Sequence, residues 1–278
     1  MLGSDFCRLL ESTGHVALPF SHAQLDVQNL KDVSEALSSA RPDVVIHAGA
    51  FTNVDECERS PETGYAANTL GTENVALACE RIGATMVYVS SCGIFDGKKA
   101  APYSEFDAPA PLTHYARSKF LGEEKTIQHC AKHFVVRPGW LYGGDASHKR
   151  NFIEGRRREA AAKPELSSAS DKFGSPTYTL DFAGAVMALV DSEAYGLYHA
   201  ANRGTASRFD YVRESISALG LSNPVNPVTS EAFQRSAPVP DWEVLDNACA
   251  QMRGIFQMRP WQDALQDYTR NRLLKENQ

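Results

Sequence analysis

Apolar residues recur along the chain with two alternating periods, and this pattern is the main structural signal of the sequence. Continuous or alternating apolar runs predict strands over 15–20, 43–50, 85–91 and 197–202, and a strand followed by its exit loop over 134–142. Helical spacing predicts helices over 3–12, 28–40, 61–82, the segment that follows Thr113, 179–191 and 260–274. Strands that alternate with helices in this order are typical of a doubly wound parallel sheet, so we expect an α/β fold of Rossmann type.

The alternation loosens after Gly143-Gly144, where a basic helix, a short strand over 165–168 and a proline-rich stretch follow. We therefore expect two interleaved parts. Residues 1–148 and 178–202 would form the sheet domain, and residues 149–177 and 203–278 a smaller α+β lobe.

Composition narrows the class of protein. The chain has 278 residues, 43% of them hydrophobic, and a net charge of −6, so it offers no basic field for nucleic acid. It contains no apolar stretch long enough for a membrane span and no secretory signal at its start. Its six cysteines are scattered without a C-x-x-C pair, which fits reduced thiols in a cytoplasmic protein and predicts no metal site.

Tyr115, Lys119 and Ser91 form the main candidate catalytic group. Tyr115 and Lys119 are four residues apart, so on a helix they share one face, and an ammonium there would lower the pKa of the phenol. Such a tyrosine can exchange a proton with a carbonyl or an alcohol. Ser91 ends the apolar run 85–91, and the carboxyl end of a strand is where open parallel sheets carry their ligand sites.

Several longer motifs surround this group: His-Ala-Gly-Ala-Phe-Thr-Asn-Val-Asp at 47–55, Phe-Asp-Gly at 95–97, Arg-Pro-Gly-Trp-Leu-Tyr at 137–142 and Gly-Ser-Pro-Thr at 174–177. With them the chain resembles the extended short-chain dehydrogenases/reductases, and within that group it is most similar to the dTDP-4-dehydrorhamnose reductase family. The resemblance runs from about Leu2 to Trp261. It implies hydride transfer from NADPH or NADH to the C4 ketone of a nucleotide-linked 6-deoxy sugar.

The resemblance also assigns roles to residues. Tyr115 would protonate the new alkoxide, Lys119 would hold the nicotinamide ribose, and Ser91 would bind the substrate oxygen. Trp140 and Val54 would line the substrate pocket beside Ser91 and Cys92. The expected cofactor contacts are Gly3, Asp26, Val27, Ala50, Phe51, Thr52, Tyr115 and Lys119. The sheet domain would then bind the dinucleotide, the smaller lobe would bind the substrate, and the protein could form a homodimer.

Two departures from the family pattern stand out. The family carries Asp-Tyr directly after the catalytic hydroxyl residue, whereas this chain has Cys92-Gly93. The lost aromatic hydroxyl leaves space beside the sugar and puts the identity of the ketosugar in question.

The second departure is at the amino end. The family opens with a strand and Gly-x-x-Gly-x-x-Gly, whose amides approach the cofactor pyrophosphate, and here only Gly3 matches. A central strand would be absent, and each lost buried pairing costs about 1–3 kcal/mol against a total stability of ~5–15 kcal/mol. We expect the natural chain to start upstream, which the preceding DNA would reveal.

Three alternatives stay open. A non-catalytic regulatory or binding subunit of the same fold is the rival function. The run Arg156-Arg157-Arg158, with Lys149 and Arg150, could meet a nucleotide diphosphate or be a solvated helix face. The segment Pro19-Phe20-Ser21-His22 has no carboxylate to bind ribose hydroxyls, which slightly favours NADP over NAD.

Overall fold

The centre of the molecule is a four-stranded parallel sheet. A computed structural model describes residues 1–148 and 151–273. The sheet has the order β1-β2-β3-β8 and consists of β1 (Val44–His47), β2 (Thr85–Val89), β3 (His133–Pro138) and β8 (Gly196–Ala200). All three strand pairs are parallel, as the alternation of strands and helices predicted.

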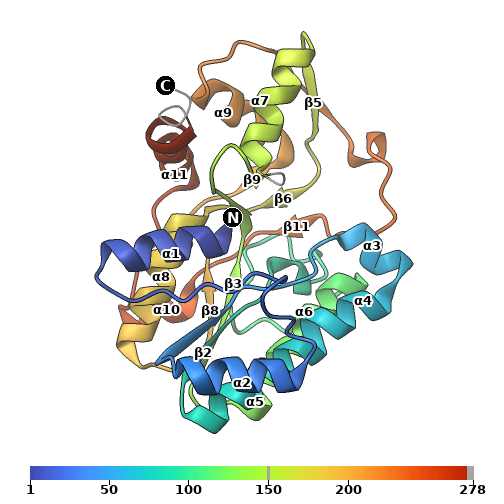
Figure 1. The fold of residues 1–278 in the computed structure, drawn as a ribbon. Helices are drawn as coiled ribbons and strands as arrows, with labels where there is room; N and C mark the ends of the chain where they lie inside the picture. Colours follow the sequence, from blue (N-terminus) through green and yellow to red (C-terminus); the bar gives the residue numbers. More distant parts are fainter. Residues whose placement is uncertain (149–150, 274–278) are drawn as a thin grey trace.

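Helices cover both faces of this sheet (Figure 1). One face carries α2 (Leu30–Ala40), α5 (Gly71–Ile82) and α6 (His114–His129), and the other carries α1 (Leu2–Ser12), α8 (Thr179–Ser192) and α10 (Ala248–Arg253). Successive side chains of a strand point to opposite faces. Accordingly, Met86 and Tyr88 pack toward α2 and α5, whereas Val87 and Val89 pack toward α1 and α8. The sheet is therefore buried on both sides.

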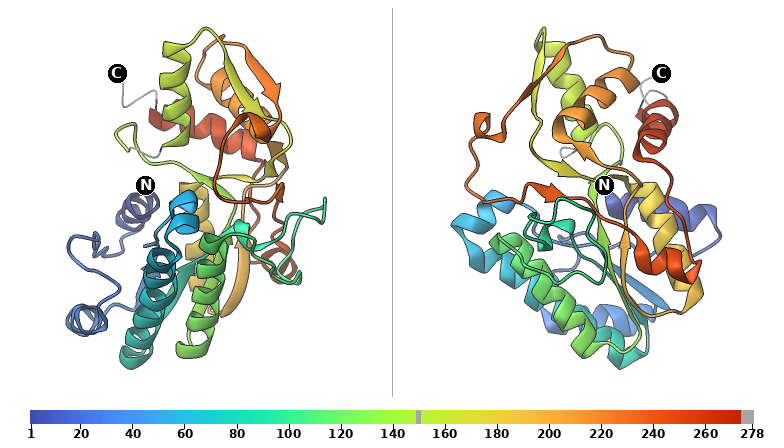
Figure 2. Two further views of the ribbon diagram at one scale, coloured as in Figure 1. Left: turned by 90° about the vertical axis from the view of Figure 1, so that its right-hand side faces the viewer. Right: turned by 180° about the vertical axis from the view of Figure 1, so that it is seen from behind.

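A smaller part of the chain forms a lobe of short strands and helices, seen from two further sides in Figure 2. Its strand pairs are β4 (Trp140–Tyr142) with β7 (Pro176–Tyr178) and β5 (Leu166–Ala169) with β10 (Val225–Val228). A third sheet places β6 (Phe173–Gly174) between β11 (Trp242–Glu243) and β9 (Ala206–Ser207). The helices α7 (Phe152–Ala162), α9 (Arg208–Ala218) and α11 (Trp261–Tyr268) complete the lobe, whose core is rich in aromatic rings.

The strand predicted over 15–20 is wrong. The segment has no ladder partner, and Val16, Leu18 and Phe20 are 86%, 55% and 50% exposed. In the described part of the chain β1 pairs with β2 alone, so its other edge is open. An extended segment becomes a strand only where a neighbouring strand accepts its hydrogen bonds, and none lies beside residues 15–20.

The exit loop predicted at the end of 134–142 is itself a short strand. β3 ends at Pro138 in the central sheet, and β4 begins at Trp140 in the smaller lobe. Gly139 makes this transition possible because a Cβ there would lie 2.1 Å from the Ser175 carbonyl oxygen. The absence of a side chain lets the chain pass from one lobe to the other.

The long helix predicted over 61–82 is present, with an irregular middle. α4 (Pro61–Tyr65) continues through a π-helical turn, η1 (Ala66–Leu70), into α5. A π turn inside a helix commonly marks a functional site. No helix in the residues that the structure describes is long and apolar enough to cross a membrane.

Candidate active site

Tyr115 and Lys119 lie in the first two turns of α6, as predicted. The helix begins where the Thr113 side chain accepts a hydrogen bond from the Ala116 N–H at 3.1 Å, a typical N-cap. Lys119 is 2% exposed, and its Nζ lies 4.2 Å from the centre of the Tyr88 ring. The helix cap therefore fixes the position of a buried ammonium against the central sheet.

Ser91 meets Tyr115 just beyond the end of β2. The Ser91 Oγ accepts a hydrogen bond from the Gly93 N–H at 3.1 Å, which caps the short 3-10 turn Cys92–Ile94. The Ser91 hydroxyl also interacts with the Tyr115 side chain and lowers the pKa of the phenol. The carboxyl end of β2 thus brings the predicted serine and tyrosine together.

Burial dominates the electrostatics of Tyr115. Burial raises the pKa of Tyr115 above its usual value and Ser91 partly opposes this shift, while a lowering of this pKa by Lys119 stays a prediction. Burial lowers the pKa of Lys119 to about 7, and Glu123 opposes the shift. At neutral pH Tyr115 therefore carries its proton and can act as an acid.

Asn68 ties the loop after β1 to the helix of Tyr115. Its Oδ1 accepts from the Phe51 N–H at 2.8 Å, and its Nδ2 donates to the Phe51 carbonyl at 3.0 Å and to Ser118 Oγ at 2.9 Å. Asn68 is fully buried in the π turn. Sequence reasoning misses it, because an asparagine inside a helix is as often simply a satisfied polar residue.

The other predicted cofactor residues lie on separate elements. The Asp26 carboxylate accepts from the Gln28 N–H at 3.0 Å, and the Val27 carbonyl accepts from Asn74 Nδ2 at 2.9 Å, which fixes this segment against α5. Gly3 lies in the first turn of α1, and a Cβ added there would meet nothing within 4 Å. Protein packing therefore leaves open space beside Gly3.

Trp140, predicted to line the substrate pocket, contacts two residues that the sequence did not single out, Glu243 and Arg208. Trp140 is 8% exposed, and its Nε1 donates to the Glu243 carboxylate at 2.9 Å. The Arg208 guanidinium lies 3.4 Å from the centre of the Trp140 ring. Burial raises the pKa of the Cys92 thiol well above its usual value, so Cys92 is not an activated nucleophile.

Val54 begins the short helix α3 (Val54–Arg59) at the boundary with the smaller lobe. The next residue, Asp55, accepts hydrogen bonds from the Ser236 and Ala237 N–H groups, both at 3.0 Å. Val54 is therefore held where the two parts of the chain meet.

The run of arginines on α7 is paired within its own helix. Arg156 contacts Glu159 at 2.7 Å, and Arg157 and Arg158 contact Glu154 at 2.6 and 3.0 Å. Lys149 and Arg150 lie outside the described residues. These pairs favour the interpretation as a helix face. Within 1–148 and 151–273 no group of three or more His, Cys, Asp or Glu side chains is arranged to hold a metal ion.

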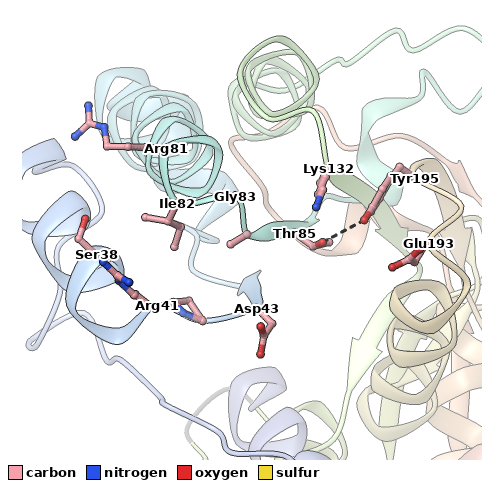
Figure 3. Close-up of a pocket in the computed structure, with 12 residues that line it drawn as sticks. Ser38, Arg41, Asp43, Arg81, Ile82, Gly83, Thr85, Lys132, Glu193 and Tyr195 are labelled. Atoms are coloured by element: carbon pink, nitrogen blue, oxygen red, sulfur yellow. Dashed lines mark hydrogen bonds between the residues drawn. The ribbon is translucent and has the colours of Figure 1, made fainter.

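A cavity of about 690 Å³ opens elsewhere, at the amino ends of β1 and β2 (Figure 3). It is lined by residues such as Arg41, Asp43, Arg81, Lys132 and Tyr195. Ligands of open parallel sheets bind at the carboxyl ends of the strands, where Ser91 and Tyr115 lie. The cavity is therefore distinct from the candidate active site.

Comparison with known proteins agrees with this geometry. Residues 1–273 match the family described as RmlD substrate binding domain. The chain belongs to this family. It is 35% identical to the dTDP-4-dehydrorhamnose reductase of Mycolicibacterium smegmatis, over 96% of this chain and 81% of that protein. It is 34% identical to the spore coat polysaccharide biosynthesis protein SpsK of Bacillus subtilis, over 98% and 94% of the two chains.

Solved structures of the family superpose closely. The Bacillus anthracis dTDP-4-dehydrorhamnose reductase, solved in complex with NADP, has a TM-score of 0.92 at 32% identity and covers 96% of this chain and 94% of its own. An RfbD orthologue from Clostridium acetobutylicum, described as a dTDP-4-dehydrorhamnose reductase, gives the same TM-score and coverage at 31% identity. The fold of this chain is therefore that of the family, with Rossmann-like architecture.

Proposed function

We propose that this protein is an NAD(P)H-dependent reductase of the C4 ketone of a nucleotide-linked 6-deoxy-4-keto sugar. The observation that carries the proposal is the arrangement of Tyr115 and the buried Lys119 one helical turn apart on α6, with the Ser91 hydroxyl close enough to lower the pKa of Tyr115. Its similarity to dTDP-4-dehydrorhamnose reductases over nearly the whole chain supports the substrate class.

The chemistry follows from the states of these side chains. A bound NADPH or NADH would supply the hydride. Tyr115 would give its proton to the oxygen at C4, and the raised pKa of the free tyrosine keeps that proton available. Ser91 would hold the same oxygen in place. The Lys119 ammonium would stabilise the negative charge that Tyr115 acquires on giving up its proton.

The described residues fit such a cofactor in part. The loop 50–52 follows β1 at the carboxyl edge of the sheet, and Asn68 fixes it beside α6. The open space beside Gly3 lies in the first turn of α1, where backbone N–H groups favour phosphate. Among the predicted pyrophosphate glycines, Gly3 is the one that the sequence contains.

We accordingly propose the following roles. The cofactor contacts are Gly3, Asp26, Val27, Ala50, Phe51, Thr52, Tyr115 and Lys119, and the substrate contacts are Val54, Ser91, Cys92 and Trp140. Residues 1–148 and 178–202 would form most of the dinucleotide-binding domain, and 149–177 and 203–278 most of the substrate lobe, except that β4 belongs to the lobe and α10 packs on the central sheet. We expect the enzyme to act in the cytoplasm.

The test follows NADPH and NADH oxidation with dTDP-4-dehydrorhamnose. We expect turnover, and a loss of about 100- to 10,000-fold in kcat for Tyr115→Phe because the proton donor is removed. Tyr195→Phe is the matched control, since its hydroxyl contacts Thr85 at the opposite end of the sheet. Ketosugar binding without oxidation of either cofactor would favour the regulatory subunit instead.

A further inference from the structure

Three residues from different elements of the smaller lobe, Gly174, Arg208 and Glu243, surround Trp140. In the three-stranded sheet, Glu243 of β11 lies opposite Gly174 of β6, and β9 on the other side of β6 leads directly into Arg208, the first residue of α9. A Cβ added at Gly174 would lie 2.2 Å from Trp140 Cε2. This sheet therefore holds Gly174, Arg208 and Glu243 around one indole ring.

These contacts leave the indole little surface for a ligand. Trp140 is 8% exposed, the Arg208 guanidinium stacks 3.4 Å from its centre, and its N–H is already donated to Glu243. A sugar that enters the site would meet the charged groups that cover the tryptophan. Trp140 therefore offers a ligand only its small exposed surface and also supports the Glu243 carboxylate.

The Glu243 carboxylate faces the same space as Ser91. A Cβ added at Gly93 would lie 3.3 Å from Glu243 Oε1 and 3.5 Å from Ser91 Oγ. The carboxylate and the hydroxyl therefore border the same small space beside Gly93. Cys92 Sγ lies 3.7 Å from the same carboxylate oxygen. The space left beside Ser91 by Cys92-Gly93 is therefore occupied by the Glu243 carboxylate.

The Glu243 carboxylate can accept more hydrogen bonds than its protein neighbours donate. Two carboxylate oxygens accept about four hydrogen bonds, whereas from residues 1–148 and 151–273 Glu243 accepts one from the Trp140 indole N–H and a weak one from the Cys92 thiol. Glu243 is partly exposed, so a ligand can reach it. A purely structural glutamate in a dry core would have its remaining lone pairs satisfied by the protein.

We propose that Glu243 is a specificity-determining residue that accepts a hydrogen bond from the C3 hydroxyl of the ketosugar. This inference rests on the proposed function, which puts the C4 oxygen on Ser91. The neighbours of C4 in such a sugar are C3, which bears a hydroxyl, and C5, which bears the methyl group. When the C4 oxygen is bound to Ser91, the C3 hydroxyl is the neighbouring group that can donate a hydrogen bond to the Glu243 carboxylate. Arg208 and Gly174 position Trp140, whose N–H orients Glu243.

The experiment compares two dTDP-linked 6-deoxy-4-keto sugars, one with a C3 hydroxyl and one 3-deoxy, on the full chain. For the unmodified enzyme we expect kcat/KM to fall about 10- to 100-fold when the hydroxyl is removed, the range of a hydrogen bond to a charged group. In Glu243→Ala this preference should shrink to within about threefold. Glu243→Gln keeps a hydrogen-bond acceptor without the charge, so its preference for the C3 hydroxyl should lie between those of the unmodified enzyme and Glu243→Ala.

Asp241→Asn is the matched control, because Asp241 is two residues away, 74% exposed and paired with Lys172 at the surface. It should keep the full preference. A preference that survives in Glu243→Ala, or that is absent from the unmodified enzyme, would overturn the inference while turnover still supports the reductase. Absence of turnover with both sugars would instead refute the proposed function, and the inference with it.

Discussion

A buried ion pair lies directly behind Ser91 and Tyr115, the proposed catalytic residues. Glu123 of α6 accepts two hydrogen bonds from Arg137 of β3, at 2.8 and 2.6 Å, and one from Ser90 at 2.5 Å. Both charged side chains are at most 3% exposed. The pair fastens the helix of Tyr115 to the sheet beside Ser91, and the Glu123 charge raises the pKa of Lys119 against the effect of burial.

Removal of one member of the Glu123–Arg137 pair should therefore lower the stability of the protein. We expect Glu123→Gln to lower the free energy of unfolding by about 3–5 kcal/mol, because Arg137 would remain charged and buried. Urea denaturation measures this. Glu35→Gln is the control, since Glu35 belongs to an exposed pair with Lys31 at 3.8 Å and should change stability by less than about 1 kcal/mol. Equal losses in the two variants would contradict the argument.

At the scale of elements, the π turn η1 determines how the loop 50–52 meets α6, the helix of Tyr115. It places Asn68 so that one side chain contacts both the Phe51 backbone and Ser118 of α6. The Thr69 hydroxyl adds a hydrogen bond to the Ser118 carbonyl at 2.9 Å. Three elements thus meet at one turn, so a change there should affect both stability and cofactor binding.

Asn68→Ala tests this. The change leaves the Phe51 N–H and carbonyl without partners, so we expect a loss of about 2–4 kcal/mol in unfolding free energy. The KM for NADPH should also rise, because loop 50–52 loses its anchor. The exposed Asn226, which contacts Glu165 on the surface, provides the control: Asn226→Ala should stay within about 0.5 kcal/mol. An unchanged KM for NADPH in Asn68→Ala would show that the π turn does not influence cofactor binding.

At the scale of the whole molecule, two buried histidines set the response to acid. His47 ends β1, and burial together with the Lys119 charge lowers its pKa to about 3. His199 in β8 is likewise lowered to about 3 by burial and by Arg137. Unfolded histidine titrates near pH 6.5, so below that pH the unfolded chain binds more protons than the folded one.

Stability should consequently fall as the pH drops from about 6.5 toward 3, by about 1.4 kcal/mol per pH unit for each histidine. His47→Gln can keep the contact with Thr72, which lies 3.2 Å from His47 Nε2, and removes one titrating group. The difference in stability between the unmodified protein and this variant should shift in favour of the variant as the pH falls. Denaturation series at pH 7, 6 and 5 measure it, and a difference that is constant with pH would refute the assignment.

The sequence predicts the fold well where a local pattern is sufficient. Apolar runs such as 85–91 mark buried strands, and Thr113 marks the start of α6. The strand over 15–20 fails, because a strand depends on a neighbour that the local pattern does not contain. Glu243 and Arg208 are missed for a related reason: distant strand pairing brings them to Trp140, and no local motif marks either one.

The open edge of β1 has a consequence for amide hydrogen exchange. In a parallel pair, alternate residues of a strand direct their backbone groups to the same neighbour, so those between them face outward. Along Val44–His47, amides that face β2 should exchange slowly and those on the open side quickly. β3 lies between β2 and β8, so its amides should be protected on both sides. Protection should therefore alternate by residue in β1 and be continuous in β3.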